Sequence, residues 1–143
     1  MPLSEAVRKV CEAYESILVL KSHVTWICSL DGHIAVWDGM CPELGTAGSG
    51  DVLAGLIAGL AARKLALLKR GKPKPGIPAA KPDEGDAVTA LKESSLGAVI
   101  AHGRAGSSLA RTIGWFEASD IAAEASRILS AAGTHLTLRA GSR

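Results

Sequence analysis

Apolar residues follow several different spacings along the chain, and these spacings predict its first elements. In residues 4–14 they repeat as on one face of a helix, with Ser4 as the N-cap. Residues 17–20 are a short unbroken apolar run, typical of a central strand buried on both faces of a parallel sheet. Residues 24–30 and 33–38 are two more strand-like runs, joined by Asp31-Gly32. Because Asp-Gly favours a tight turn between strands, these two runs predict a β-hairpin.

The second half of the chain is dominated by helical patterns. Residues 49–68, 87–112 and about 119–131 predict three helices, the second of them capped by Asp86. The first carries small residues on one face, which would let it lie close against strands: Gly55, Ala58, Gly59 and Ala62. Residues 70–86 hold four of the six prolines and predict an extended loop insertion. Residues 134–143 alternate too briefly to predict a strand.

Composition narrows the fold class and the compartment. The 143 residues are 48% hydrophobic but only 3% aromatic, so a single core of Ala, Leu, Ile and Val is expected, as in α/β proteins. Three cysteines without CxxC spacing, Cys11, Cys28 and Cys41, and the lack of a signal-peptide pattern predict reduced thiols and a cytoplasmic protein.

Charge and hydropathy argue against two kinds of partner. Sixteen basic and 14 acidic residues give a net charge of +2, too balanced for a nucleic-acid or membrane surface. The longest apolar stretch, residues 52–62, is far shorter than the roughly 20 residues of a membrane span. Neither nucleic acid nor a membrane is therefore expected as a partner.

A glycine-rich segment carries the main chemical signal. Residues 45–60 read GTAGSGDVLAGLIAGL, in which a tight turn runs directly into a helix. Successive backbone N–H groups and the positive end of that helix form a phosphate cradle, with Asp51 placed as a base beside the phosphate. This arrangement suggests phosphoryl transfer to a hydroxyl. The same residues can also be an ordinary helix start, and the segment is neither a P-loop nor the GxGxxG fingerprint, so both interpretations stay open.

Other residues have a structural and a chemical interpretation. His102 on an apolar helix face is expected to be packed and hydrogen-bonded rather than a catalytic base. Trp26 and Trp37 on the hairpin favour core packing over stacking on an adenine. Cys41 has no basic neighbour that would make its thiol reactive. The four histidines form no metal-ligand set.

Several motifs together resemble one family. Val19-Leu20-Lys21 followed by Thr25, the string GSGDVLAG at residues 48–55, and AHGRAG at residues 101–106 are similar to the carboxyl-terminal half of the ADP- or ATP-dependent NAD(P)H-hydrate dehydratases. That family belongs to the ribokinase-like superfamily. The similarity extends from about residue 5 to residue 131, interrupted by the Pro-rich insertion at residues 70–86.

The resemblance implies a fold and a reaction. The fold would be a partial ribokinase-like α/β domain, with a mostly parallel sheet, a β-hairpin and packed helices. ADP or ATP, with Mg²⁺, would phosphorylate the ring hydroxyl of hydrated NADH or NADPH, and loss of phosphate would restore the cofactor. Asp51 would be the catalytic carboxylate. The nucleotide would be held by two segments: Lys21, Ser22, His23, Val24 and Thr25, and Thr46, Ala47, Gly48, Ser49 and Gly50.

The chain also departs from the family. Ser22 replaces a glycine, Cys41 replaces an asparagine, and Glu43 adds a negative charge near the anion site. Residues 1–143 would form only the carboxyl-terminal, nucleotide-binding half of the domain, so a second chain supplying the rest, or self-association, is expected. The alternatives to a split or truncated dehydratase are a ribokinase-like small-molecule kinase and a non-catalytic nucleotide-binding remnant.

Overall fold

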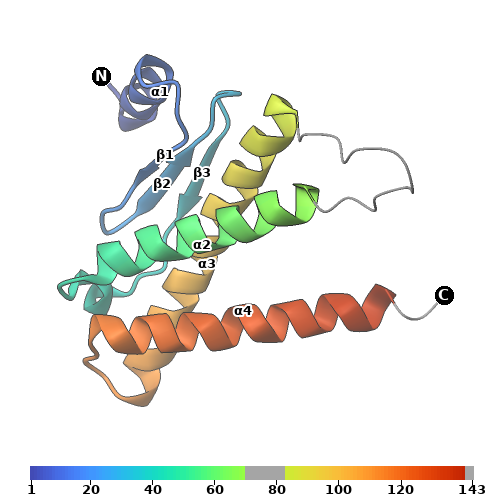
Figure 1. The fold of residues 1–143 in the computed structure, drawn as a ribbon. Helices are drawn as coiled ribbons and strands as arrows, with labels where there is room; N and C mark the ends of the chain where they lie inside the picture. The colour runs from blue at the N-terminus through green and yellow to red at the C-terminus, as the bar shows by residue number, and fades with distance from the viewer. Residues whose placement is uncertain (70–82, 141–143) are drawn as a thin grey trace.

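The chain folds into helices packed on both faces of a small sheet (Figure 1). The computed structural model describes residues 1–69 and 83–140. Its elements are α1 (Leu3–Ala13), β1 (Leu18–Leu20), β2 (Thr25–Cys28), β3 (Ile34–Trp37), the short 3-10 helix η1 (Pro42–Gly45), α2 (Ser49–Lys69), α3 (Glu84–Thr112) and α4 (Ala118–Ala140). The expected α/β class is confirmed.

The sheet is antiparallel, so the prediction of a mostly parallel sheet was wrong. The strand order is β1-β2-β3, with Leu18 opposite Cys28 and Thr25 opposite Trp37. Residues 17–20 therefore contribute an edge strand rather than a central parallel one. The reason is the short link between β1 and β2, residues 21–24, because a parallel connection needs a crossover of about a dozen residues.

The predicted hairpin is confirmed at its turn. Gly32 has φ of +77°, a conformation that favours glycine. Asp31 accepts hydrogen bonds from the Ser29 hydroxyl and the His33 amide, and it forms an ion pair with Lys92 of α3 at 2.6 Å. The lysine and these hydrogen bonds hold the pKa of the Asp31 carboxyl well below its usual range. The turn is thereby attached to α3.

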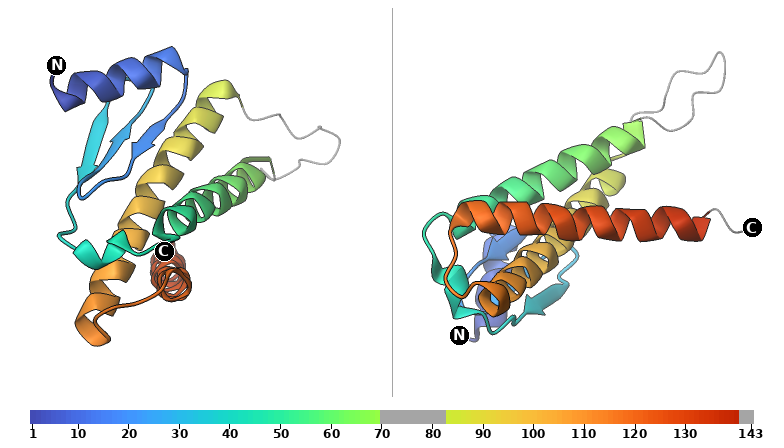
Figure 2. Two further views of the ribbon diagram at one scale, coloured as in Figure 1. Left: turned by 90° about the vertical axis from the view of Figure 1, so that its left-hand side faces the viewer. Right: turned by 90° about the horizontal axis from the view of Figure 1, so that it is seen from below.

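The layers follow from the alternation of side chains along β2. Trp26 and Cys28 face α1, where Val7, Cys11 and Cys28 form a small core cluster. Ile27 faces the other way and packs with α2 and α3 in a second cluster. A third cluster joins α4 to α3 and η1. Figure 2 shows the backbones of these elements near one another. Trp26 packs against the first cluster and Trp37 against the second, so core packing, the interpretation favoured from the sequence for both, is confirmed.

The small-residue face of α2 lies elsewhere than predicted. A Cβ added at Gly55 or Gly59 would meet nothing within 4 Å, and Ala58 and Ala62 are exposed. The prediction that this face lies against strands was therefore wrong. The larger residues on the opposite side of α2 pack against the sheet and α3 instead: Leu53, Leu56, Ile57 and Leu60.

Helix ends differ from the predictions in detail. α1 begins after Pro2, which has no side-chain cap, so Ser4 is not its N-cap. α4 continues to Ala140, beyond the expected end near residue 131, so Gly133 lies within the helix and does not end it. Of the predicted Pro-rich insertion, residues 70–82 lie outside the described residues, whereas residues 84–86 already belong to the first turn of α3.

The N-cap of α3 is Asp83 rather than the predicted Asp86. The Asp83 side chain accepts a hydrogen bond from the Asp86 amide at 2.8 Å. We expect Asp83→Ala to lower the free energy of unfolding by about 1 kcal/mol, because a first-turn N–H loses its acceptor. Asp86→Ala is the matched control, since it leaves the cap in place. Urea unfolding of both variants checks this, and a larger loss for Asp86→Ala would contradict the assignment.

Candidate functional site

A cavity of about 830 Å³ lies where the sheet, η1, α2 and α3 meet. Four stretches of chain form it: the turn between β1 and β2, the segment from the end of β3 to η1, helix α2 and helix α3. Its lining residues are Lys21, Ser22, His23, Thr25, Trp37, Asp38, Gly39, Met40, Cys41, Pro42, Leu44, Gly45, Leu53, Val99, His102 and Gly103. Pockets of this size bind small molecules in many proteins.

The β1–β2 turn brings four of its five predicted binding residues to the cavity. Lys21, Ser22, His23 and Thr25 line it, whereas Val24 does not. The Ser22 hydroxyl donates to the Val24 carbonyl at 2.7 Å, and Ser22 has no positive φ, so serine fits here without backbone strain. Serine in place of the family's glycine therefore does not distort this turn.

Lys21 joins the sheet to η1. Its Nζ donates to the Leu44 carbonyl at 3.2 Å. Leu44 lies so close to α3 that a Cβ on Gly106 would come within 2.5 Å of it, so glycine at 106 permits this approach. A carbonyl oxygen is a weaker partner for an ammonium group than a phosphate oxygen is. A phosphate in the cavity could therefore replace the Leu44 carbonyl as the partner of Lys21.

The glycine-rich loop, residues 46–50, connects η1 to α2 beside the cavity. Gly48 has φ of +81°, and the Ser49 amide donates to the Thr46 carbonyl at 3.3 Å. Within the described chain, the amides of Gly50 and Asp51 donate to no backbone carbonyl, as is usual in a first helical turn. A Cβ on Gly50 would meet nothing within 4 Å. The amides of Gly50 and Asp51 are therefore left without a backbone acceptor at the amino end of α2, and the space beside the Gly50 Cα is open.

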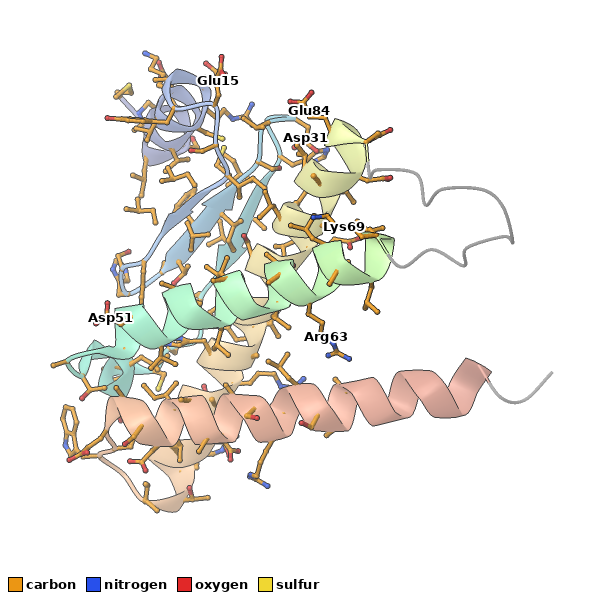
Figure 3. All side chains as sticks on the ribbon, viewed as in Figure 1. Glu15, Asp31, Asp51, Arg63, Lys69 and Glu84 are labelled. Atoms are coloured by element: carbon orange, nitrogen blue, oxygen red, sulfur yellow. The ribbon has the colours of Figure 1, made fainter. Side chains whose placement is uncertain are left out.

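Asp51 stands apart from the cavity lining. It is exposed in the first turn of α2, and Figure 3 shows its side chain pointing away from α4, toward the half of the molecule that holds the sheet. Neither Asp51 nor the predicted residues Thr46, Ala47, Gly48, Ser49 and Gly50 line the cavity. The cavity and the loop meet at Gly45, which lines the cavity and directly precedes the loop.

His102 connects α3 to the start of α2. Its side chain is buried, and Nε2 lies 2.9 Å from the Ser49 carbonyl and 3.2 Å from the Ser49 hydroxyl. The contact with a carbonyl requires a proton on Nε2. Burial, and secondarily the charge of Lys21, lower the pKa of His102, so the ring is neutral near pH 7. The interpretation of His102 as a packed, hydrogen-bonded histidine is confirmed.

The Cys41 thiol is hydrogen-bonded. Its Sγ donates to a carboxylate oxygen of Glu43 at 3.3 Å. Burial first, and this hydrogen bond second, raise the pKa of the Cys41 thiol. Both effects favour the protonated thiol over the reactive thiolate.

Sequence reasoning missed part of the cavity wall. Leu53 and Val99 lie within predicted helices but were given no part in a site, and Leu44 was not singled out. Gly103 packs tightly against this wall, since a Cβ there would lie 2.2 Å from Trp37. One part of the wall could have been found from the predicted hairpin. Its register places Trp37 opposite the predicted binding residue Thr25, and both line the cavity.

Two further properties concern metals and membranes. Among the side chains described, those of residues 1–69 and 83–132, no three of His, Cys, Asp or Glu gather closely enough to hold a metal ion. None of the described helices is long and apolar enough to cross a membrane.

These features define an α/β protein in which a glycine-rich loop opens a helix beside a small-molecule cavity, a class whose ligands are often phosphorylated. The chain belongs to the NAD(P)H-hydrate dehydratase family, whose model matches residues 2–129. It is 37% identical over 99 residues to the ADP-dependent (S)-NAD(P)H-hydrate dehydratase of Xanthomonas campestris pv. campestris, covering 69% of this chain and 26% of that protein.

Two other relatives have related names. The bifunctional NAD(P)H-hydrate repair enzyme of Moorella thermoacetica is 36% identical over 110 residues, or 77% of this chain and 16% of that protein. The ADP-dependent (S)-NAD(P)H-hydrate dehydratase of Neisseria meningitidis serogroup B is 45% identical over 58 residues, or 41% of this chain and 20% of that protein. The chain thus spans a quarter or less of the Moorella and Neisseria relatives and 26% of the Xanthomonas one. No solved structure matches the chain.

Proposed function

We propose that this chain is the nucleotide-binding, carboxyl-terminal part of an NAD(P)H-hydrate dehydratase with a partial ribokinase-like fold. The observation that carries the proposal is that the family match over residues 2–129 includes both the glycine-rich loop and the adjoining cavity. The substrate would be hydrated NADH or NADPH. ADP is the proposed co-substrate, because the Xanthomonas and Neisseria relatives are named as ADP-dependent.

The proposed reaction has two steps. In the first, the terminal phosphoryl group moves from ADP to the hydroxyl oxygen of the hydrated ring, leaving AMP, while Asp51 takes the hydroxyl proton. In the second, the ring C–O bond breaks, phosphate leaves with that oxygen, and loss of a neighbouring ring proton restores the double bond. Asp51 is suited to the first step because it lies at the amino end of α2 with its side chain exposed.

The binding residues would act around the phosphates. Lys21 would leave the Leu44 carbonyl for a phosphate oxygen, and Thr25 would bind polar atoms of the nucleotide, with Ser22, His23 and Val24 shaping the turn. In the loop, Thr46, Ala47, Gly48, Ser49 and Gly50 would surround the transferring group. The Ser49 amide is already bonded to Thr46, so the amides of Gly50 and Asp51 are the better donors.

Mg²⁺, which the resemblance implies, would be held mainly by the phosphates of the nucleotide and by water, and would neutralise part of their charge. One or two carboxylates complete such a site, so it needs no cluster of three acidic, His or Cys side chains, and none gathers among the described ones. The steps proposed above are assigned to residues of this chain and to the nucleotide.

A partner is part of the proposal. The exposed small-residue face of α2 is one surface suited to close packing. The exposed Leu20 and Val36, on β1 and β3, are apolar groups at the two edges of the described sheet. A separate polypeptide supplying the rest of the domain, or a second copy of this chain, would cover them.

Of the two alternative functions, only the non-catalytic remnant is supported by a separate observation. The family match favours a dehydratase over a ribokinase-like kinase of small molecules. A non-catalytic nucleotide-binding remnant is favoured only by the small share of the relatives' length that the chain spans.

The proposal is tested on the full chain in two stages. Calorimetry with ADP and with ATP measures binding. A second assay then follows the return of NADH absorbance and the release of phosphate from hydrated NADH. Binding with turnover supports the dehydratase. Binding without turnover, even with enzyme and substrate at equal concentration, supports the remnant, and binding of neither nucleotide rules out both. Transfer of phosphate to pyrimidine or thiazole alcohols would instead support the kinase.

A further inference from the structure

The cavity has an apolar inner wall and a polar rim. Trp37, Leu53 and Val99 all pack in the core cluster beneath the sheet and line the cavity as well. The charged groups that line it, Lys21 and Asp38, are at the ends of β1 and β3 rather than in that cluster. A ligand with one apolar and one charged end fits this division.

Two glycines leave room for the indole of Trp37. A Cβ on Gly39 would lie 2.6 Å from the indole nitrogen of Trp37, and a Cβ on Gly103 would lie 2.2 Å from it. The nitrogen edge is therefore enclosed between the chain after β3 and helix α3. Since the indole also lines the cavity, the rest of the ring must supply that surface.

The indole nitrogen has no polar partner. Nε1 is buried and makes no hydrogen bond with any of the described residues. A phenylalanine would avoid this cost of burying an N–H group. What tryptophan contributes at this position is therefore its large flat ring, and not the hydrogen-bond donor Nε1–H.

We propose that Trp37 is the stacking surface for the purine ring of the nucleotide and so determines specificity for it; this rests on the proposed function. Aromatic rings stack face to face with an offset, and a purine offers a flat ring of this kind. Hydration interrupts the conjugation of the nicotinamide ring and puckers it, so the hydrated ring is the poorer partner. Gly45 leads from the cavity to the loop, and Lys21 lies on the rim, so the phosphates extend toward α2.

Fluorescence tests the contact without altering Trp37. The chain has three tryptophans, and the double variant Trp26→Phe/Trp115→Phe leaves Trp37 as the sole one. We expect ADP and adenosine to quench its emission, and inorganic pyrophosphate to leave it unchanged. Quenching by pyrophosphate equal to that by ADP would contradict a contact with the base.

Substitution of Trp37 tests its energetic role. Trp37→Leu should weaken ADP binding about 10-fold or more, because one stacked base is lost, and should leave pyrophosphate binding unchanged. Trp37→Phe should recover most of the affinity. Gly103→Ala, which displaces the indole without removing it, should shift the emission of the sole-tryptophan protein and weaken ADP binding. Circular dichroism of each variant verifies that it folds.

The outcomes separate this inference from the proposed function. If ADP binds to the wild type but Trp37 emission does not change and Trp37→Leu binds ADP equally well, the stacking role is wrong while the proposed function stands. If ADP quenches Trp37 but hydrated NADH is not converted, the stacking role stands and the dehydratase activity of the chain is wrong. If neither ADP nor adenosine binds, both are wrong.

Discussion

Asp51→Asn should lower kcat for dehydration of hydrated NADH by about 10³-fold, because a general base typically contributes 10² to 10⁴ in rate. The amide has nearly the same shape as the carboxylate but cannot accept the hydroxyl proton. ADP binding should persist or tighten slightly, because a negative charge beside the phosphates is removed. Steady-state kinetics together with calorimetry checks both parts. The measurement uses the chain alone or combined with a polypeptide supplying the rest of the domain.

Asp86→Asn is the matched control for this experiment. Asp86 is also an exposed carboxylate in the first turn of a helix, α3, but it does not line the cavity. Its replacement should leave kcat unchanged. If kcat of Asp51→Asn equals that of the wild type, Asp51 does not act as the base. An equal loss of kcat in both variants would indicate a general effect of charge.

His102→Leu should lower the free energy of unfolding by about 1–3 kcal/mol, because the buried carbonyl and hydroxyl of Ser49 lose their partner. Ser49 is the first residue of α2, so this loss also loosens the end of the glycine-rich loop. His33→Leu is the control, since His33 is exposed and its side chain makes no hydrogen bond with the described residues. Urea unfolding near pH 8 measures the difference, and an unchanged midpoint for His102→Leu would contradict the role.

The wild type and His102→Leu should differ in how their stability changes with falling pH. The pKa of His102 is lowered in the folded state, so the unfolded state binds the proton more readily. The stability that the neutral ring contributes is complete above its ordinary pKa of about 6.5 and is lost as the pH falls from there through the folded-state pKa. His102→Leu lacks this loss, so the difference between wild type and variant should shrink below about pH 6. A constant difference across that range would exclude the protonation effect.

Local interactions made several elements predictable. The hairpin followed from Asp31-Gly32, and the start of α2 at Ser49 followed from a glycine-rich turn ahead of an apolar stretch. These signals work because turn conformation and helix initiation depend on residues close together in the sequence. The N-cap of α3 was the exception, since Asp83 and Asp86 are both suitable capping residues three positions apart.

Features that depend on distant parts of the chain were less predictable. An apolar run such as residues 17–20 fits either a central or an edge strand, and only the pairing with β2 made it an edge. Small residues on α2 were expected at a contact, yet the helix turned its larger side chains inward. Helical periodicity defines a face but does not say which neighbour that face meets.

The α/β class, the hairpin, the glycine-rich loop at the amino end of α2 and the resemblance to one family all followed from the amino-acid sequence, because each depends on neighbouring residues or a short motif. The antiparallel pairing, the cavity lined by Trp37 and the contact of His102 with Ser49 arise only in the folded chain. These join residues far apart in the chain, such as Ser49 and His102, or Gly39 and Gly103 on either side of one indole. Only packing brings such residues together, because no local spacing records their distance in space.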